Sequence, residues 1–319
     1  MRKFFFIVCA VIPGIIIHYN AGAQSTDTGD MYVDYKQYFQ ETLTVFSSNH
    51  NFLAKNIKEL QDSSAQLIDE AAPGINIKAL PGNTKKMDDE DIFPKRKNSV
   101  FIVGKLLNHK PNLDASFELP GTAFAIDENG ICVTNYHVLK GLIRRKEQEN
   151  ENDSLYFIMT TGKKIYFIDK VIAYSQNNDI AVFRVNTRGD KLQAVPFGKP
   201  AREGATVYCI SHPLGIFYYL TKGIVARNVT VASEQAAAGY NPAGKPPIRM
   251  EITADYGVGS SGGPILDKYG NLIGMVSSTM PIGFLLQTGI NPTGHQQMVV
   301  KDAIPVKAIV ELLRKDNTK

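Results

Sequence analysis

The stretch Gly259-Ser260-Ser261-Gly262-Gly263-Pro264 decides between the folds open to this chain. Two glycine-rich patterns fit it: G-x-G-x-x-G over 257–262, typical of dinucleotide-binding folds, and G-x-S-x-G over 259–263, typical of α/β-hydrolases. Both patterns need a helix directly behind the glycines. Here Pro264-Ile265-Leu266 and a turn follow, which predicts a strand. The stretch therefore favours a turn between strands, and a plain glycine-rich turn without chemistry stays open as an interpretation.

Short β-branched and aromatic runs surround this turn from Ser99 onward, and no helical period separates them. They form two groups of six, with a joint at Thr187–Pro200, and Asn129-Gly130 predicts a tight hairpin in the first group. This pattern predicts an all-β fold of two six-stranded antiparallel barrels. Ala303–Arg314 predicts a closing helix. The predicted strands are Val100–Gly104, Thr122–Ile126, Ile131–Thr134, Leu155–Thr160, Lys164–Tyr174, Ile180–Val185, Thr206–Ser211, Tyr218–Ala226, Arg249–Thr253, Pro264–Leu266, Leu272–Ser278 and Gln297–Val300.

The remaining domain boundaries follow from shifts in pattern. Residues 1–23 combine a basic start, an apolar stretch and an Ala-Gly-Ala cleavage pattern, which predicts a bacterial signal peptide cut after Ala23. Residues 24–75 carry apolar side chains at spacings of three and four, which predicts a helical extension. Residues 76–98 are interpreted as a linker whose charged runs are solvated loop. Residues 99–319 then form one domain, with barrel one at about 99–187, barrel two at about 201–302 and the helix at 303–314.

Composition excludes several classes of protein. The chain has 319 residues, 44% hydrophobic and 21% charged, which is ordinary for a soluble globular protein. Loss of the signal would remove Arg2 and Lys3 from 35 basic residues and leave 33 against 31 acidic ones. That balance favours neither a nucleic-acid partner nor an anionic membrane surface.

The cysteines point to an exported protein without disulfides. Cys132 and Cys209 remain after signal removal, each inside an apolar run, which predicts two buried free thiols. We expect no metal and no cofactor, because the sequence contains no metal-ligand spacing. Export without disulfides fits a bacterial periplasm or the cell exterior.

Ser261 could act as a nucleophile if the fold supplies a base and two backbone donors. A serine hydroxyl needs a neighbouring base, and the oxyanion formed by its attack needs two N–H groups aimed at one point. Gly259 lets the backbone turn its N–H inward. His137 closely follows the strand Ile131–Thr134, where a histidine can project between the barrels. His212 is the rival base, but its Pro-Gly context favours a turn.

An acid between the histidine and the serine would complete the set. Asp179 opens the apolar strand Ile180–Val185, and a carboxylate there can hold the imidazole tautomer. Asp169 is the rival, but it lies inside a strand-like run beside Lys170, which favours a solvated ion pair. A histidine and an aspartate in the first barrel and a serine in the second would place the site where the barrels meet.

From Ser99 to about Leu313 the sequence resembles trypsin-fold serine proteases, closest to the protease domain of the HtrA (Deg) type. The resemblance implies that His137 is the general base, Asp179 its orienting acid and Ser261 the nucleophile. It also implies that the N–H groups of Gly259 and Ser261 form the oxyanion hole, and that the substrate is a protein or peptide. The matching pieces are Gly121–Ile126, Thr134–Val138, Asp179–Val182, His212–Gly215, Thr221–Val225, the 259–264 stretch and Ala303–Val306.

Two departures from the family pattern carry expectations of their own. Ser260 stands where these families usually have Asn or Asp, and in trypsin-type zymogens that Asp pairs with the newly freed N-terminal amine. We therefore expect that activation of this chain does not use such an ion pair, although Ile102-Val103-Gly104 superficially resembles the N-terminus that forms it. Only a few residues follow the last predicted helix, which predicts no PDZ domain.

The specificity pocket stays open at this stage. Asp255 lies six residues before Ser261, where trypsin-like enzymes place an acid that selects Lys or Arg, but a role as a turn cap is favoured. Ser277 and Ser278 are further pocket candidates.

The leading interpretation is an exported serine endopeptidase whose oligomeric state the sequence leaves unknown. A histidine base predicts activity that rises through about pH 6–7. The alternatives are a catalytically inactive binding protein on the same fold and an esterase that uses the same triad.

Overall fold

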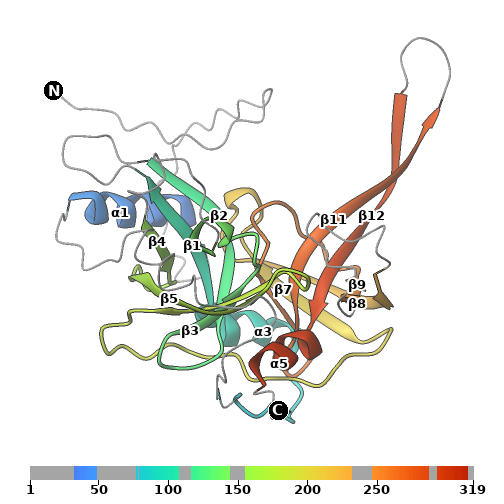
Figure 1. The fold of residues 1–319 in the computed structure, drawn as a ribbon, viewed down its shortest axis with the longest axis horizontal. Coiled ribbons are helices and arrows are strands. Elements are labelled where there is room, and N and C mark those ends of the chain that lie inside the picture. The colour runs from blue at the N-terminus through green and yellow to red at the C-terminus, as the bar shows by residue number, and fades with distance from the viewer. Residues whose placement is uncertain are drawn as a thin grey trace.

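The computed structural model describes residues 32–48, 77, 79–107, 116–143, 155–231, 246–286 and 293–314. Two closed antiparallel barrels of six strands each dominate it (Figure 1), with neighbouring strands in the order β1-β2-β3-β6-β5-β4 and β10-β11-β12-β9-β8-β7. The predicted all-β fold of two six-stranded barrels is thereby confirmed. The first barrel contains β1 (Val100–Leu107), β2 (Ser116–Ala125), β3 (Ile131–Thr134), β4 (Leu155–Met159), β5 (Ile165–Ser175) and β6 (Ile180–Val185). The second contains β7 (Thr206–Ser211), β8 (Tyr219–Thr230), β9 (Ile248–Ile252), β10 (Pro264–Leu266), β11 (Leu272–Leu286) and β12 (Thr293–Pro305).

The predicted turns and breaks position the strands. Gly130 turns the chain between β2 and β3 with a φ of +100°, a conformation that glycine adopts without steric cost. The Ile126 N–H closes the hairpin by donating to the Ile131 carbonyl at 2.9 Å. The joint between the barrels, Thr187–Pro200, contains no strand beyond one isolated bridge from Phe197 to Leu272. The 259–264 turn leads into β10, a strand and not a helix.

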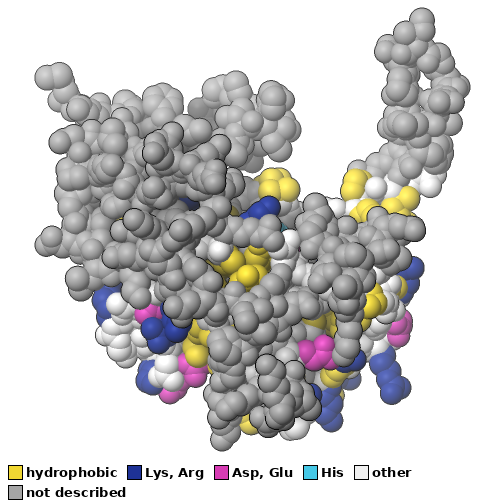
Figure 2. Space-filling view, viewed as in Figure 1, with side chains coloured by type: hydrophobic (Ala, Val, Ile, Leu, Met, Phe, Trp, Pro, Cys, Tyr) yellow, Lys and Arg dark blue, Asp and Glu magenta, His cyan; other side chains and the backbone are white. Residues whose placement is uncertain are grey.

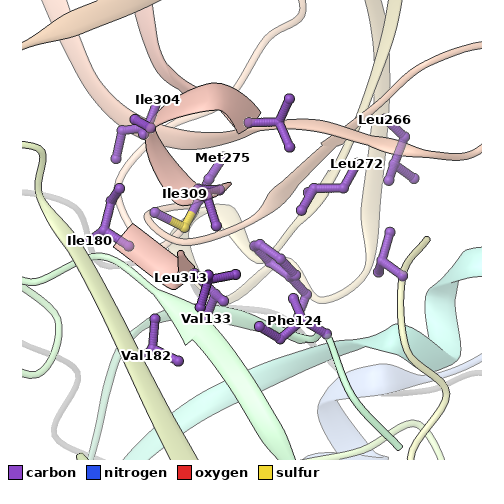
Figure 3. Close-up of a cluster of buried hydrophobic side chains, with 14 of the residues drawn as sticks. Phe124, Val133, Ile180, Val182, Leu266, Leu272, Met275, Ile304, Ile309 and Leu313 are labelled. Carbon is purple, nitrogen blue, oxygen red and sulfur yellow. The ribbon is translucent and has the colours of Figure 1, made fainter. Parts of the chain in front are cut away.

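The largest apolar cluster is shared by both barrels and the helix α5 (Val306–Leu313) (Figure 3). Phe124 and Val133 enter it from the first barrel, Leu272 and Ile304 from the second, and Ile309 from α5, all fully buried. Burial of such side chains stabilises a fold by about 1.5–3 kcal/mol each. The helix therefore closes the seam between the barrels and fixes their relative position.

The C-terminal strands are longer than predicted. The predicted strand Gln297–Val300 extends from Thr293 to Pro305, so Ala303 lies in β12 and the helix begins only at Val306. His295, whose polar neighbours in sequence predict a loop, also lies on β12. The reason is that β11 and β12 continue to pair with each other beyond the barrel, up to Leu286 opposite Thr293.

This pairing forms a hairpin that projects from the second barrel (Figure 1). Its base carries exposed apolar side chains (Figure 2), among them Met280, Ile282 and Met298. The cross-strand pairs Met280 with Val300 and Ile282 with Met298 place these side chains on one face of the hairpin.

Residues 79–88 are mostly exposed and form no helix or strand, but residues 89–98 are not solvated loop, which corrects the sequence interpretation for that part of the segment 76–98. Asp89–Arg96 is a helix, α3, followed by the short 3₁₀ helix η2 (Lys97–Ser99). The acidic run lies at the helix N-terminus and the basic run at its C-terminus, where each charge is favourable to the helix dipole. Ile92 is fully buried, and the buried Arg96 donates from Nε to the carbonyl of Gly270 at 2.7 Å. The charged runs therefore stabilise a helix that packs on the second barrel.

Part of the predicted helical extension is described. Helix α1 (Tyr35–Ser48) falls inside 24–75 and lies beside β1 and β4 (Figure 1). The predicted signal peptide lies outside the described residues. In the part of the chain that the structure describes, no helix is both long and apolar enough to span a membrane. The described residues also include the short helices α4 (Lys140–Ile143) and η4 (Pro213–Gly215).

Cys132 and Cys209, the two cysteines among the described residues, are buried and free, as predicted. Burial raises the pKa of the Cys209 thiol to about 12 and also raises the pKa of Cys132. Both thiols therefore stay protonated and unreactive at neutral pH.

Candidate active site

His137 and Asp179 form the best-defined polar contact near the barrel seam. His137 lies three residues after the end of β3, and Asp179 lies directly before β6, the strand that pairs with β3. The imidazole Nδ1 is 3.0 Å from Oδ1 and 2.9 Å from Oδ2 of the carboxylate. Since a carboxylate only accepts hydrogen bonds, a neutral imidazole in this contact carries its proton on Nδ1 and its lone pair on Nε2. This is the tautomer that a general base requires.

The backbone around the pair holds the carboxylate in place. Asp179 has a φ of +60°, a left-handed conformation that Asp and Asn adopt more readily than other side chains. Its carbonyl accepts from the Tyr136 N–H at 3.1 Å and from the Asn135 side-chain amide at 3.0 Å. Its carboxylate also accepts from the His137 N–H at 3.0 Å and from the Ser277 hydroxyl at 3.2 Å. The acid is thus fixed by both barrels, since Ser277 belongs to β11.

The Ser261 turn is anchored on the first barrel. The Ser261 carbonyl accepts from the Thr122 N–H at 2.8 Å, and the Thr122 hydroxyl donates to the Gly259 carbonyl at 2.9 Å. Gly262, at a φ of +85°, lies so close to Thr134 that a Cβ there would be 2.3 Å from the threonine Oγ1. Thr134 is the last residue of β3. The turn therefore packs against the strand that leads into His137.

The structure brings His137 and Asp179 into contact and brings the Ser261 turn beside them. Among the contacts of the described residues, no hydrogen bond joins the His137 imidazole to the Ser261 hydroxyl. The His137 side chain is 47% exposed, so its Nε2 edge is reachable from solvent. Catalytic hydrogen bonds are often long before substrate binds.

Two backbone donors beside Ser261 remain available. The Ser260 N–H bonds the Gly257 carbonyl at 3.0 Å, and the Gly263 N–H bonds the Ser260 carbonyl at 2.9 Å. Within the described part of the chain, the N–H groups of Gly259 and Ser261 donate to no protein acceptor. Gly259 reaches this arrangement at a φ of +91°. Free donors on alternate residues are the element that an oxyanion hole needs.

Ser260 occupies a closed, uncharged environment. Its side chain is fully buried and accepts hydrogen bonds from the Ser211 hydroxyl at 3.0 Å and the Gly257 N–H at 3.3 Å. Ile102 lies in the interior of β1 and is 1% exposed, so it is no chain terminus in this structure. These positions provide no acidic partner for a newly formed N-terminal amine.

His212 has an environment opposite to that of His137. It is 3% exposed, and its Nδ1 accepts from the Tyr218 N–H at 2.9 Å. Burial lowers the pKa of His212 to about 3. The ring is neutral at physiological pH and contacts no carboxylate among the described residues, which agrees with its interpretation as part of a turn.

The other candidates separate into surface and structural positions. Asp255 is 83% exposed and pairs with Lys301 at 3.1 Å, which agrees with a turn position better than with a pocket acid. Asp169 pairs with Arg184 at 3.0 Å, so the expected ion pair is present with a different partner from Lys170. The Ser277 hydroxyl donates to Asp179, whereas Ser278 is the cross-strand partner of Asp302.

Sequence reasoning missed Arg249. Its side chain lies in β9, is 8% exposed, and its Nη1 donates to the Ile248 carbonyl at 3.0 Å. Burial lowers the pKa of Arg249, and the nearby carboxylates of Asp179 and Asp302 partly oppose that shift. An arginine within a strand gives no sign in sequence that it will be buried near the candidate acid.

Comparisons with known proteins agree with this geometry. Residues 121–275 match the family model for the trypsin-like peptidase domain, a stretch that contains all three candidate triad residues. The chain is 29% identical over 214 residues to protease Do-like 5, chloroplastic, of Arabidopsis thaliana, which covers 63% of this chain and 64% of the relative. It is 25% identical over 274 residues to a "probable periplasmic serine endoprotease DegP-like" of Rickettsia prowazekii, with 80% and 47% covered. The chain thus spans less than two thirds of the length of these relatives.

The fold also has a counterpart among solved structures. The HtrA-type protease AlgW, solved with a decapeptide, aligns with a TM-score of 0.50 at 18% sequence identity, over 71% of this chain and 66% of that one. At this identity the likeness concerns the fold alone. The family model and the sequence relatives together support a trypsin-fold protease domain of the HtrA (Deg) type, and the solved structure adds a likeness of fold.

Proposed function

We propose that this protein is a serine endopeptidase with the triad His137, Asp179 and Ser261. The observation that carries the proposal is the His137 imidazole bonded through Nδ1 to the Asp179 carboxylate, beside the turn that presents Ser261. The domain type is that of proteases, and the free N–H groups of Gly259 and Ser261 support an oxyanion hole.

In the proposed reaction, the Ser261 Oγ forms a bond to the carbonyl carbon of a peptide while its proton passes to Nε2 of His137. The carbonyl oxygen becomes an oxyanion that the Gly259 and Ser261 N–H groups stabilise. The C–N bond then breaks, and the amine leaves with the proton held by His137. Water, deprotonated by the same imidazole, hydrolyses the acyl-enzyme and restores the serine hydroxyl.

We further propose that the protein works outside the cytoplasm. The expected signal peptide at 1–23 supports this, and one relative is named a periplasmic protease. The substrate class is protein or peptide, as expected for a protease domain.

Digestion of a peptide library by the mature protein, residues 24–319, tests the proposal. We expect internal peptide bonds to be cleaved, and Ser261→Ala to lower the rate by about 10⁴-fold or more with the fold retained, as measured by mass spectrometry and circular dichroism. Equal cleavage by wild type and Ser261→Ala would contradict the assignment. Ester hydrolysis without peptide cleavage would indicate an esterase, and no turnover of either would indicate a binding protein.

A further inference from the structure

Helix α1 packs on a turn that no part of the proposed mechanism uses. This turn, residues 212–218, connects β7 to β8 and is called here the 212–218 turn. Phe39 and Leu43 of α1 are each 5% exposed and belong to the same apolar cluster as Phe217 and Tyr218. The rings of Phe39 and Phe217 lie 5.0 Å apart. The helix thus covers one side of the turn.

The 212–218 turn has a backbone that needs support. Leu214 has a φ of 50° and Tyr218 a φ of 56°, in the left-handed region that bulky side chains rarely adopt. Such conformations persist where surrounding contacts determine them. Tyr218 is buried, and its ring packs 5.2 Å from that of Tyr35 on α1. Helix α1 therefore supplies contacts that keep the strained residue in place.

His212 ties the two ends of the turn together. Its Nδ1 accepts from the Tyr218 N–H at 2.9 Å, and its ring centroid lies 4.8 Å from that of Tyr218 and 5.9 Å from that of Phe217. Burial keeps the ring neutral, so Nδ1 stays an acceptor at physiological pH.

The other face of the turn touches the Ser261 region. The Leu214 N–H donates to the Val258 carbonyl at 2.7 Å. A Cβ on Gly259 would lie 2.7 Å from the His212 carbonyl, so the two backbones are in contact. The Val258 carbonyl belongs to the same peptide group as the Gly259 N–H, so the 212–218 turn fixes the direction in which that N–H points.

We propose that α1 and the 212–218 turn position the Gly259 N–H of the oxyanion hole, with Phe39 and His212 as positioning residues. The proposal rests on the proposed function for its catalytic consequence. An oxyanion-hole donor stabilises the transition state more than the bound substrate, so its position affects kcat. The proposal therefore gives helix α1 a role in the turnover of the same chain.

The test uses the mature protein, residues 24–319, with three substitutions on α1. Phe39→Ala removes the ring that contacts Phe217, Phe39→Leu restores apolar volume, and Gln40→Ala changes an exposed neighbour on the same helix. We expect Phe39→Ala to lower kcat by about 10- to 100-fold with KM changed by less than about twofold, Phe39→Leu to recover most of kcat, and Gln40→Ala to match wild type.

Hydrogen–deuterium exchange of the 257–262 amides provides a readout independent of turnover. We expect the hydrogen-bonded amides of this stretch, Gly257, Ser260 and Gly262, to exchange about tenfold faster in Phe39→Ala than in wild type or Gln40→Ala, while amides of β3 and β6 keep their rates. Unchanged kcat and unchanged 257–262 exchange in a folded Phe39→Ala would overturn the proposal. Faster exchange in a protein that has no peptidase activity would contradict the proposed function and support the structural coupling.

Discussion

His137 and His212 lie in regions of the molecule that treat the same side chain in opposite ways. His137 follows β3, is half exposed and donates to a carboxylate that both barrels hold. His212 precedes η4, is buried, and uses its Nδ1 to accept a backbone N–H. The first arrangement leaves a nitrogen free to take a proton, and the second suppresses protonation.

The comparison shows how environment assigns chemistry to a residue type. A carboxylate partner stabilises imidazolium, so the histidine beside it can accept and return a proton. Burial without such a partner destabilises the charged ring and leaves a neutral hydrogen-bond acceptor suited to hold a turn. The proposed base and the proposed positioning residue differ in this respect and not in residue type.

Replacing each histidine should give the largest contrast. We expect His137→Ala to lower kcat/KM by about 10⁴-fold or more, because Ser261 would lose its base. His212→Asn should lower it by at most about tenfold, since the asparagine side-chain oxygen can accept the Tyr218 N–H. Steady-state kinetics on a peptide substrate gives both values. A greater loss in His212→Asn than in His137→Ala would reverse the assignment of the two histidines.

The loss of folding stability at acidic pH should give the next largest contrast, because the buried environment of His212 disfavours its protonated form. The folded-state pKa of His212 is about 3, below its ordinary value of 6.5, so the unfolded chain binds more protons between these pH values. The stability that neutral His212 contributes is present above about pH 6.5 and is lost as the pH falls toward 3. Between pH 7 and 5, wild type should lose about 2 kcal/mol more free energy of unfolding than His212→Asn. Urea unfolding at both pH values measures this difference, and equal losses would contradict it.

Removing the Ser277 hydroxyl that donates to Asp179 should have the smallest effect of the three changes. Ser277→Ala removes the hydroxyl that donates to Asp179 Oδ2, and we expect kcat/KM to fall by about tenfold. Ser278→Ala is the matched control, because Ser278 pairs across the strands with Asp302 and not with Asp179, and it should leave kcat/KM within about twofold of wild type. Comparable losses in both variants would show that the Ser277 contact to the acid has no special role.

The barrel cores were predictable because their strands consist of β-branched and aromatic residues bounded by turns. Ile131–Thr134, Ile180–Val185, Thr206–Ser211 and Pro264–Leu266 agree with the structure residue for residue. The outer halves of β11 and β12 were not predictable, since they contain glycine, proline and polar residues and form only because the two strands pair with each other.

Several features of the structure depend on contacts between residues far apart in the sequence, and local sequence patterns did not predict them. The charged runs of α3 gave no sign of a helix that buries Ile92, and Ser277 gave no sign that it would reach a residue 98 positions away. The contact of His137 with Asp179 followed from the adjacency of β3 and β6, whereas the contact of α1 with the 212–218 turn depends on packing that no local pattern records.

Fluorophosphonate labelling followed by peptide mapping tests the proposed triad most directly. The reagent transfers its phosphonyl group to an activated serine, so the account predicts one adduct, on Ser261, in wild type and its loss in His137→Ala. Labelling of Ser261 at the same rate with and without His137, or an unlabelled Ser261 in folded wild-type protein, would contradict the account.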